Sequence, residues 1–138
     1  MARNVELKAR VEDLATIERR ARELIFYRRP DLAGPKLSEY TIALTPTPAL
    51  MRETLAGALG VIGRVRKRRR LYLVGATRIH LDEVEDLGSF LELEVVLEDD
   101  EPATDGTVRA RVLLSRLGID TSGLVAGAYL DLLRASRS

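Results

Sequence analysis

The sequence predicts an α+β domain in which an antiparallel sheet has one apolar face and one charged face. Several short segments alternate strictly between apolar and charged residues, which is the pattern of strands with one buried side. The later segments follow one another through short turns, as in an antiparallel meander. Stretches with helical spacing of apolar residues accompany them, and such helices can cover the apolar face of the sheet.

Length and composition favour one globular domain, which we expect to span residues 1–138. The chain has 138 residues, of which 46% are hydrophobic and 31% charged. This is enough for one core but not comfortably for two. Lys and Arg together number 22 and Asp and Glu 21, so the net charge is only +1. An anion site must therefore come from local segregation of charge.

Composition also indicates in which cell compartment the protein works and which partners it lacks. The chain has no cysteine, so it has neither disulfides nor thiolate metal sites. No apolar stretch approaches the roughly 20 residues of a membrane span, and the first residues lack the apolar core of a signal peptide. We expect a soluble, cytoplasmic protein without a membrane partner.

The first half of the chain begins with the plainest strand pattern, Asn4–Val11. Asp13 then opens a helical pattern, which runs up to Glu23. The next strand, Leu24–Pro30, follows without any turn residue, although a helix that reverses into a sheet normally needs a connection of a few residues. Further on, the pattern predicts a strand at Leu37–Leu44 and a helix at Ala49–Leu59.

The second half of the chain predicts a meander followed by two helices. Val61–Val74 reads as one bent strand or two shorter ones, and it is followed by strands at Thr77–Val84 and Ser89–Leu97. A helix is expected over Asp105–Leu117 with Val108, Val112, Leu113 and Leu117 as its apolar side. A last helix is expected over Ala126–Arg134, using Tyr129, Leu132 and Leu133.

A basic run, Arg64–Arg70, leads directly into the apolar residues Leu71–Leu73. In an extended chain, Lys67 and Arg69 share one face with Val65 and Leu71, and the other face holds Arg64, Arg66, Arg68 and Arg70. Two readings remain open. The run is either a solvated basic edge strand that discourages aggregation or part of a sheet whose concave side holds an anion.

The charged faces of the predicted strands bring both signs of charge together. The candidate cations are Lys8, Arg10, Arg29, Lys36, Lys67, Arg69 and Arg78, and the candidate anions are Glu6, Asp82, Glu92 and Glu94. Carboxylates suit Mg²⁺ or Mn²⁺, and Arg and Lys suit phosphate oxygens, so a metal-bound polyphosphate satisfies both sets. The alternative is a charged face laced with cross-strand ion pairs and open to water.

Other chemistries fit less well. The single His80 cannot build a multi-histidine metal site, and no Ser nucleophile, Walker A loop or dinucleotide fingerprint is present. Four Tyr, two Phe and no Trp leave little for base stacking, so we do not expect a nucleic-acid partner.

Several motifs of the chain resemble those of one known family. Asn4-Val-Glu-Leu-Lys8-Ala-Arg10 resembles the Glu-x-Glu-x-Lys signature that opens the CYTH superfamily, the triphosphate tunnel metalloenzymes. The likeness continues through Leu24-Ile-Phe-Tyr-Arg-Arg-Pro, Gly34-Pro-Lys36-x-Ser38, Val65-x-Lys67-x-Arg69-x-Leu71-Tyr72, Thr77-Arg-Ile-His-Leu-Asp82, Leu87-Gly88-x-Phe90-x-Glu92-x-Glu94 and Tyr129-x-Asp-Leu-Leu133. It spans nearly the whole chain and lies nearest to the bacterial subgroup similar to class IV adenylyl cyclases.

The resemblance implies an eight-stranded antiparallel tunnel with charged residues inside and helices outside. It also implies that Glu6, Asp82, Glu92 and Glu94 hold one or two Mg²⁺ or Mn²⁺ ions. Lys8, Arg10, Arg29, Lys36, Lys67, Arg69 and Arg78 would grip the triphosphate. In a cyclase the ribose 3′-hydroxyl attacks the α-phosphorus of ATP and pyrophosphate leaves. In a triphosphatase, acting on thiamine triphosphate or inorganic triphosphate, water attacks the terminal phosphorus.

The sequence departs from this family in two places. Asn4 replaces the first Glu of the signature, which removes a charge from the metal site. The family also has two further strands before the segment that matches Leu24–Pro30, one of them with an Arg-x-Lys-x-Arg type motif. We expect this hairpin to belong to the polypeptide between Glu23 and Leu24. An ordinary peptide bond between these two residues would instead indicate a six-stranded, open and inactive variant.

Three functions follow from these observations. The leading one is a metal-dependent, class IV adenylyl cyclase-like enzyme, and the second is a triphosphatase. The third is a module that binds a phosphate compound without turnover, which would follow from loss of the hairpin or of metal binding. An exposed sheet edge would also favour a homodimer.

Overall fold

The computed structural model describes residues 2–10 and 23–137, without the side chains of Ala2, Asn4, Val5 and residues 7–10. The described strands are β1 (Ala2–Arg10), β2 (Glu23–Arg28), β3 (Lys36–Leu44), β4 (Lys67–Val74), β5 (Thr77–Val84) and β6 (Gly88–Val96). The described helices are α1 (Pro48–Leu59), α2 (Ala103–Arg116) and α3 (Tyr129–Ser136), with a short 3-10 turn at Thr121–Gly123.

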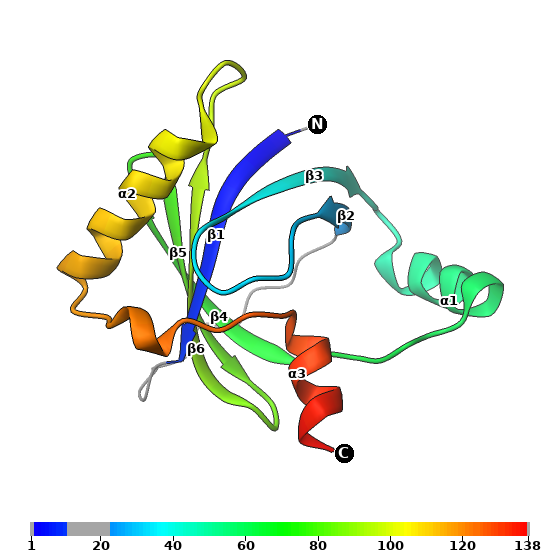
Figure 1. Ribbon diagram of the computed structural model, residues 1–138. Coiled ribbons are helices and arrows are strands. Elements are labelled where there is room, and N and C mark those ends of the chain that lie inside the picture. The colour runs from blue at the N-terminus through cyan, green and yellow to red at the C-terminus, as the bar shows by residue number, and fades with distance from the viewer. Residues whose placement is uncertain (1, 11–22, 138) are drawn as a thin grey trace.

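All six described strands form one antiparallel sheet in the order β2-β3-β1-β6-β5-β4. The α+β class and the antiparallel meander of β4, β5 and β6 are thereby confirmed. A two-residue turn joins β4 to β5, and Gly75 adopts the positive φ of 56° that this tight reversal requires. Figure 1 shows α2 on one side of β1, β5 and β6, with β2, β3 and α1 on the other side of these strands.

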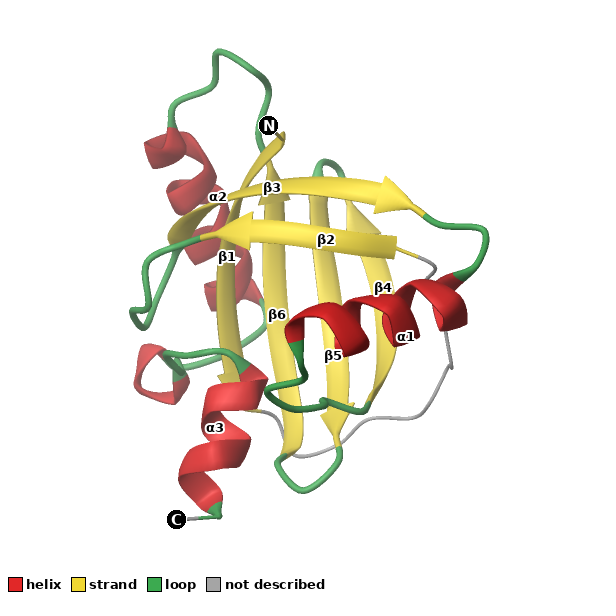
Figure 2. Cartoon of the chain, turned by 90° about the vertical axis from the view of Figure 1, so that its right-hand side faces the viewer, coloured by secondary structure: helices red, strands yellow, loops and turns green. Residues whose placement is uncertain are grey.

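The sheet curls over itself. In Figure 2, β2 and β3 cross in front of β6, β5 and β4, while α2 lies behind them. One face of the β1-β6-β5 region therefore packs on α2, and the opposite face looks toward β2 and β3. We call this second, inward face the concave face.

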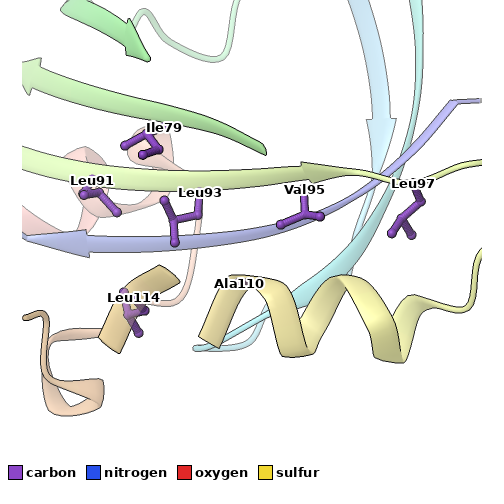
Figure 3. Close-up of a cluster of buried hydrophobic side chains, with 7 residues drawn as sticks. All are labelled: Ile79, Leu91, Leu93, Val95, Leu97, Ala110 and Leu114. Carbon is purple, nitrogen blue, oxygen red and sulfur yellow. The ribbon is translucent and has the colours of Figure 1, made fainter. Parts of the chain in front are cut away.

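The main core lies between the sheet and α2 (Figure 3). It is made of Ile79, Leu91, Leu93, Val95, Leu97, Ala110 and Leu114, all buried. The predicted apolar side of α2 is wrong at three of its four positions, because Val108, Val112 and Leu117 are 59%, 48% and 43% exposed. Leu113, the fourth, does pack against the core. The helix buries Gly106, Ala110 and Leu114 instead. Small side chains at two of these positions let the helix approach the strands closely.

A second core cluster holds α3 against the other end of the sheet. It contains Val84, Phe90 and Tyr129, with Val65, Leu87, Val125 and Leu132 packed around it. Phe90 and Tyr129 meet edge to face, with ring centroids 5.0 Å apart. Leu133 is buried as well. The predicted use of Tyr129, Leu132 and Leu133 by this helix is confirmed.

Other predicted elements differ from those found. Only the second part of Val61–Val74 forms a strand, β4. Helix α1 buries none of its residues, so the expectation that helices cover the sheet holds for α2 and α3 and not for α1. The helix expected after Asp13 lies outside the described residues. No described helix has the length and apolarity to cross a membrane.

The junction between Glu23 and Leu24 is continuous strand. Both residues belong to β2 and pair with Leu44 and Ala43 of β3. The expectation of a hairpin between them is therefore wrong for this chain. The sheet has six described strands, and no pairing between β2 and β4 closes it into a tunnel. Both strands are consequently the edges of the sheet among the described strands.

Candidate functional site

The concave face collects the charged residues because directly opposed residues of antiparallel strands share a face. Glu94 of β6 lies opposite Glu6 of β1 and Arg78 of β5. Glu92 lies opposite the backbone positions of Lys8 and His80, and Asp82 lies opposite Arg69 of β4. Lys36 of β3 also lies opposite Glu6, so five strands contribute charged residues to this face. The predicted alternation is confirmed for these positions.

Asp82 is the most enclosed of these groups, with none of its surface exposed. Arg69 grips it through two bonds, Nε to Oδ1 at 2.6 Å and Nη2 to Oδ2 at 2.5 Å. Tyr129 donates its hydroxyl to Oδ2 at 2.8 Å, and Lys67 Nζ lies 3.3 Å from the same oxygen. Although burial opposes ionisation, the bonds from Arg69 and the charge of Lys67 hold the pKa of Asp82 below its ordinary value.

Lys67 lies at the rim of this cluster. Its ammonium lies 4.9 Å from the centre of the Tyr129 ring, in a cation–π contact. Burial, and next the neighbouring charge of Arg69, lower the pKa of Lys67, while Glu92 and Asp82 act in the opposite direction.

Glu92, Glu94 and His80 form the middle of the concave face. Arg69 Nη2 donates to Glu92 Oε2 at 2.7 Å, and Arg78 Nη1 donates to Glu94 Oε1 at 2.9 Å. The imidazole of His80 lies between the two carboxylates, with Nδ1 3.8 Å from Glu92 and Nε2 3.5 Å from Glu94. His80 Nδ1 is buried without a hydrogen-bond partner among the described residues.

The remaining candidates lie around β1 and β3. Arg29, just after β2, forms a close ion pair with Glu6 and lies over the Tyr27 ring at 5.2 Å. Lys36 is 6% exposed and donates Nζ to the backbone oxygen of Leu32 at 2.7 Å. The side chains of Lys8 and Arg10 lie outside the described residues, so their predicted roles stay predictions.

The basic run divides as the alternation predicted. Lys67 and Arg69 reach Asp82 on the concave face, whereas Arg64, Arg66 and Arg68 are exposed. Arg70 is half-buried rather than fully solvated. Among the described strands β4 is an edge strand, as the first reading requires, and its inner side joins the charged face. The binding of an anion on that face stays a prediction.

Sequence reasoning missed the contribution of Tyr129 to the site. Its spacing with Leu132 and Leu133 indicated packing only, and its ring does pack on Phe90. The partner of its hydroxyl, Asp82, is 47 residues away in the chain, and no local pattern links the two. The place of His80 between two glutamates was also missed, although its alternation with Arg78 and Asp82 put it on the charged face.

The carboxylates can accommodate a divalent ion through few protein ligands. No three Asp, Glu or His side chains among the described residues form a ready-made metal cluster. Glu6 and Glu94 are nevertheless directly opposed like charges, which is unfavourable without cations between or beside them. Mg²⁺ typically takes one or two carboxylates and completes its shell with water and substrate phosphates. The donor set, with the unpartnered His80 Nδ1 beside it, fits such an ion.

The fold and the concave face together define the class of protein. It is an α+β protein with a curled antiparallel sheet whose concave face carries both carboxylates and cations. A model of the CYTH domain matches residues 3–129, so the chain belongs to the CYTH domain family. Members of this family are usually metal-dependent enzymes that act on triphosphates.

One curated relative and three solved structures extend this result. The adenylate cyclase CyaB of Aeromonas hydrophila is 31% identical over 72 residues, which are 52% of this chain and 38% of that protein. The match thus covers less than half of that relative.

The solved structures share the fold. The PH1012 protein of Pyrococcus horikoshii OT3 has a TM-score of 0.67 at 18% identity, covering 96% of this chain and 83% of the other. A conserved hypothetical protein of Pyrococcus furiosus has a TM-score of 0.65 at 16% identity, covering 94% and 99%. The PH1819 protein of Pyrococcus horikoshii OT3 has a TM-score of 0.62 at 18% identity, covering 99% and 86%.

Proposed function

We propose that this protein is a metal-dependent enzyme that acts on a nucleoside triphosphate, most closely in the manner of a class IV adenylyl cyclase. The observation that carries the proposal is the concave face. Arg69, Lys67 and Arg78 converge there with Glu6, Glu92 and Glu94, from strands far apart in the sequence. An enclosure with this many paired charges suits a ligand that is itself both anionic and metal-bound.

In this proposal the cations hold the triphosphate and the glutamates hold the metal. Arg69 and Arg78 exchange part of their bonding from Glu92 and Glu94 to phosphate oxygens, which arginine can grip in two-pronged fashion. The carboxylates released in this way, with Glu6, would bind Mg²⁺ or Mn²⁺, which neutralises charge on the phosphates. Arg29 and Lys36 complete the cationic lining, and contacts from Lys8 and Arg10 stay predictions from the sequence.

The chemistry asked of such a site is mostly positioning and charge neutralisation. In a cyclase reaction, the ribose 3′-hydroxyl attacks the α-phosphorus and pyrophosphate leaves. The similarity to CyaB supports this choice for the part of the chain that matches it. The second candidate is a triphosphatase for thiamine triphosphate or inorganic triphosphate, because the same cations would hold any triphosphate.

A direct assay tests the proposal. The purified protein is incubated with ATP, thiamine triphosphate or tripolyphosphate, each with Mg²⁺ or Mn²⁺, and cyclic AMP, pyrophosphate and orthophosphate are measured. We expect cyclic AMP and pyrophosphate in equal amounts from ATP. Orthophosphate as the product selects the triphosphatase. Tight binding without any product selects the non-catalytic module, which is the function that the open sheet of six described strands favours, and contradicts the proposal of an enzyme.

We also propose that the protein forms a homodimer. Every residue of the edge strand β2 is exposed, including Leu24, Ile25, Phe26 and Tyr27 at 43–59%. An open, apolar edge of this kind offers backbone groups and side chains to another strand. A second copy of the chain would cover this edge.

A further inference from the structure

We propose that Asp82 is an internal anchor for the triphosphate-binding cations and not a metal ligand, and that Tyr129 is a positioning residue acting through it. This inference rests on the proposed function and assigns one carboxylate of the site a different task from the other three. It also connects the C-terminal helix α3 to the binding face.

The first argument is the number of donors around the buried Asp82 carboxylate. Oδ2 accepts from Arg69 and Tyr129 and has Lys67 Nζ at 3.3 Å, while Oδ1 accepts from Arg69. A carboxylate oxygen offers about two acceptor positions, so Oδ2 has no room for a further partner. A metal ion could bind Oδ2 only by displacing donors, and the carboxylate has no exposed surface from which an ion could approach. Such displacement leaves buried charges without partners, which is strongly unfavourable.

The second argument is the contrast with the glutamates. Glu92 and Glu94 keep 19% and 14% of their side-chain surface exposed, and Glu6 keeps 24%. Asp82 keeps none. An ion arriving with a triphosphate can therefore reach the glutamates from solvent. Asp82 instead sits behind Arg69 and Lys67, where its charge holds their nitrogen atoms in place.

The third argument is the double contact of Tyr129. Its hydroxyl bonds Asp82 and its ring lies beneath the Lys67 ammonium, while Phe90 fixes the ring edge to face. A residue needed only for packing would not require the hydroxyl, since phenylalanine fills the same space. Tyr129 is also the first residue of α3. A displacement of this helix would therefore withdraw the hydroxyl from Asp82 and the ring from Lys67 at the same time.

Two substitutions separate the anchor from a metal ligand. Tyr129→Phe keeps the ring and removes the hydroxyl, and Asp82→Asn removes the charge while keeping the shape. Because a bond to a charged group is lost, we expect tripolyphosphate to bind about tenfold more weakly to either variant in calorimetry. Mn²⁺ binding without triphosphate, measured by electron paramagnetic resonance, should stay within about twofold, since neither residue ligates the ion. Glu94→Gln is the matched comparison and should lose Mn²⁺ affinity.

If the wild-type protein binds neither tripolyphosphate nor Mn²⁺, the proposed function is wrong. A measurement without any ligand then still tests the role of Asp82. Competitive acetylation read by peptide mass spectrometry compares Lys67 with Lys36, which lies on β3. Both Asp82→Asn and Tyr129→Phe should raise the relative reactivity of Lys67 severalfold, because its ammonium loses a restraint. Unchanged reactivity in folded variants overturns the anchor. An equal loss of Mn²⁺ affinity in Asp82→Asn and Glu94→Gln overturns it too, because Asp82 would then be a metal ligand.

Discussion

At the scale of single residues, the two faces of β4 separate cations that bond Asp82 from solvated cations. Lys67 bonds Asp82 on the concave face, and Arg66, next to it in the chain, is exposed. The two residues have the same charge, so a diffuse electrostatic effect of their removal would be equal. If one of these side chains contacts the triphosphate directly, its removal lowers the binding affinity more than removal of the other.

We therefore predict that Lys67→Ala weakens tripolyphosphate binding by about tenfold or more, since a charge-assisted bond is lost. Arg66→Ala should stay within about twofold at physiological salt, where exposed charges are screened beyond roughly 8 Å. Isothermal titration at 0.15 M salt measures both constants. Equal losses in the two variants would contradict the assignment of Lys67 to the site.

At the scale of elements, strands were easier to predict than helices. The period of two in β5 and β6 placed Arg78, Asp82 and Glu92 on the correct face, because a strand leaves only two choices. A helix surface offers many directions, and the apolar valines of α2 pointed to the wrong one. Gly106 and Ala110 carry no strong hydrophobic signal, yet they face the sheet because their small size permits close packing.

The packing of α2 can be tested with a pair of substitutions on one helix. Leu114 is 2% exposed and Val112 is 48% exposed. Leu114→Ala should lower the free energy of unfolding by about 2–5 kcal/mol because it leaves a cavity in the core. Val112→Ala should change it by less than about 0.5 kcal/mol. Urea unfolding followed by circular dichroism measures both, and a larger loss for Val112→Ala would show that the sequence-based face is the buried one.

At the scale of the whole molecule, the site depends on long-range pairing that no local pattern specifies. Alternation predicted which residues of β1, β5 and β6 share a face, but not which residues stand opposite one another. The pairing of Glu6 with Arg29, and of Asp82 with Tyr129, follows from the curl of the sheet and the return of α3. The absence of a turn at Glu23 was a real feature of the sequence, and its cause is that β2 begins there.

The last prediction concerns β2, which is an open edge of the sheet in the part of the chain that the structure describes. Phe26 is 59% exposed and lies opposite Thr41 of β3, which is also exposed. A lysine on an edge strand opposes strand-to-strand association because it places a charge against the incoming chain. Phe26→Lys should therefore convert a homodimer into a monomer, as measured by light scattering after size-exclusion chromatography. Thr41→Lys adds the same charge on an interior strand and should leave the dimer intact. A wild-type protein that is monomeric at every concentration contradicts the dimer, and a dimer that survives Phe26→Lys places its interface elsewhere than at β2.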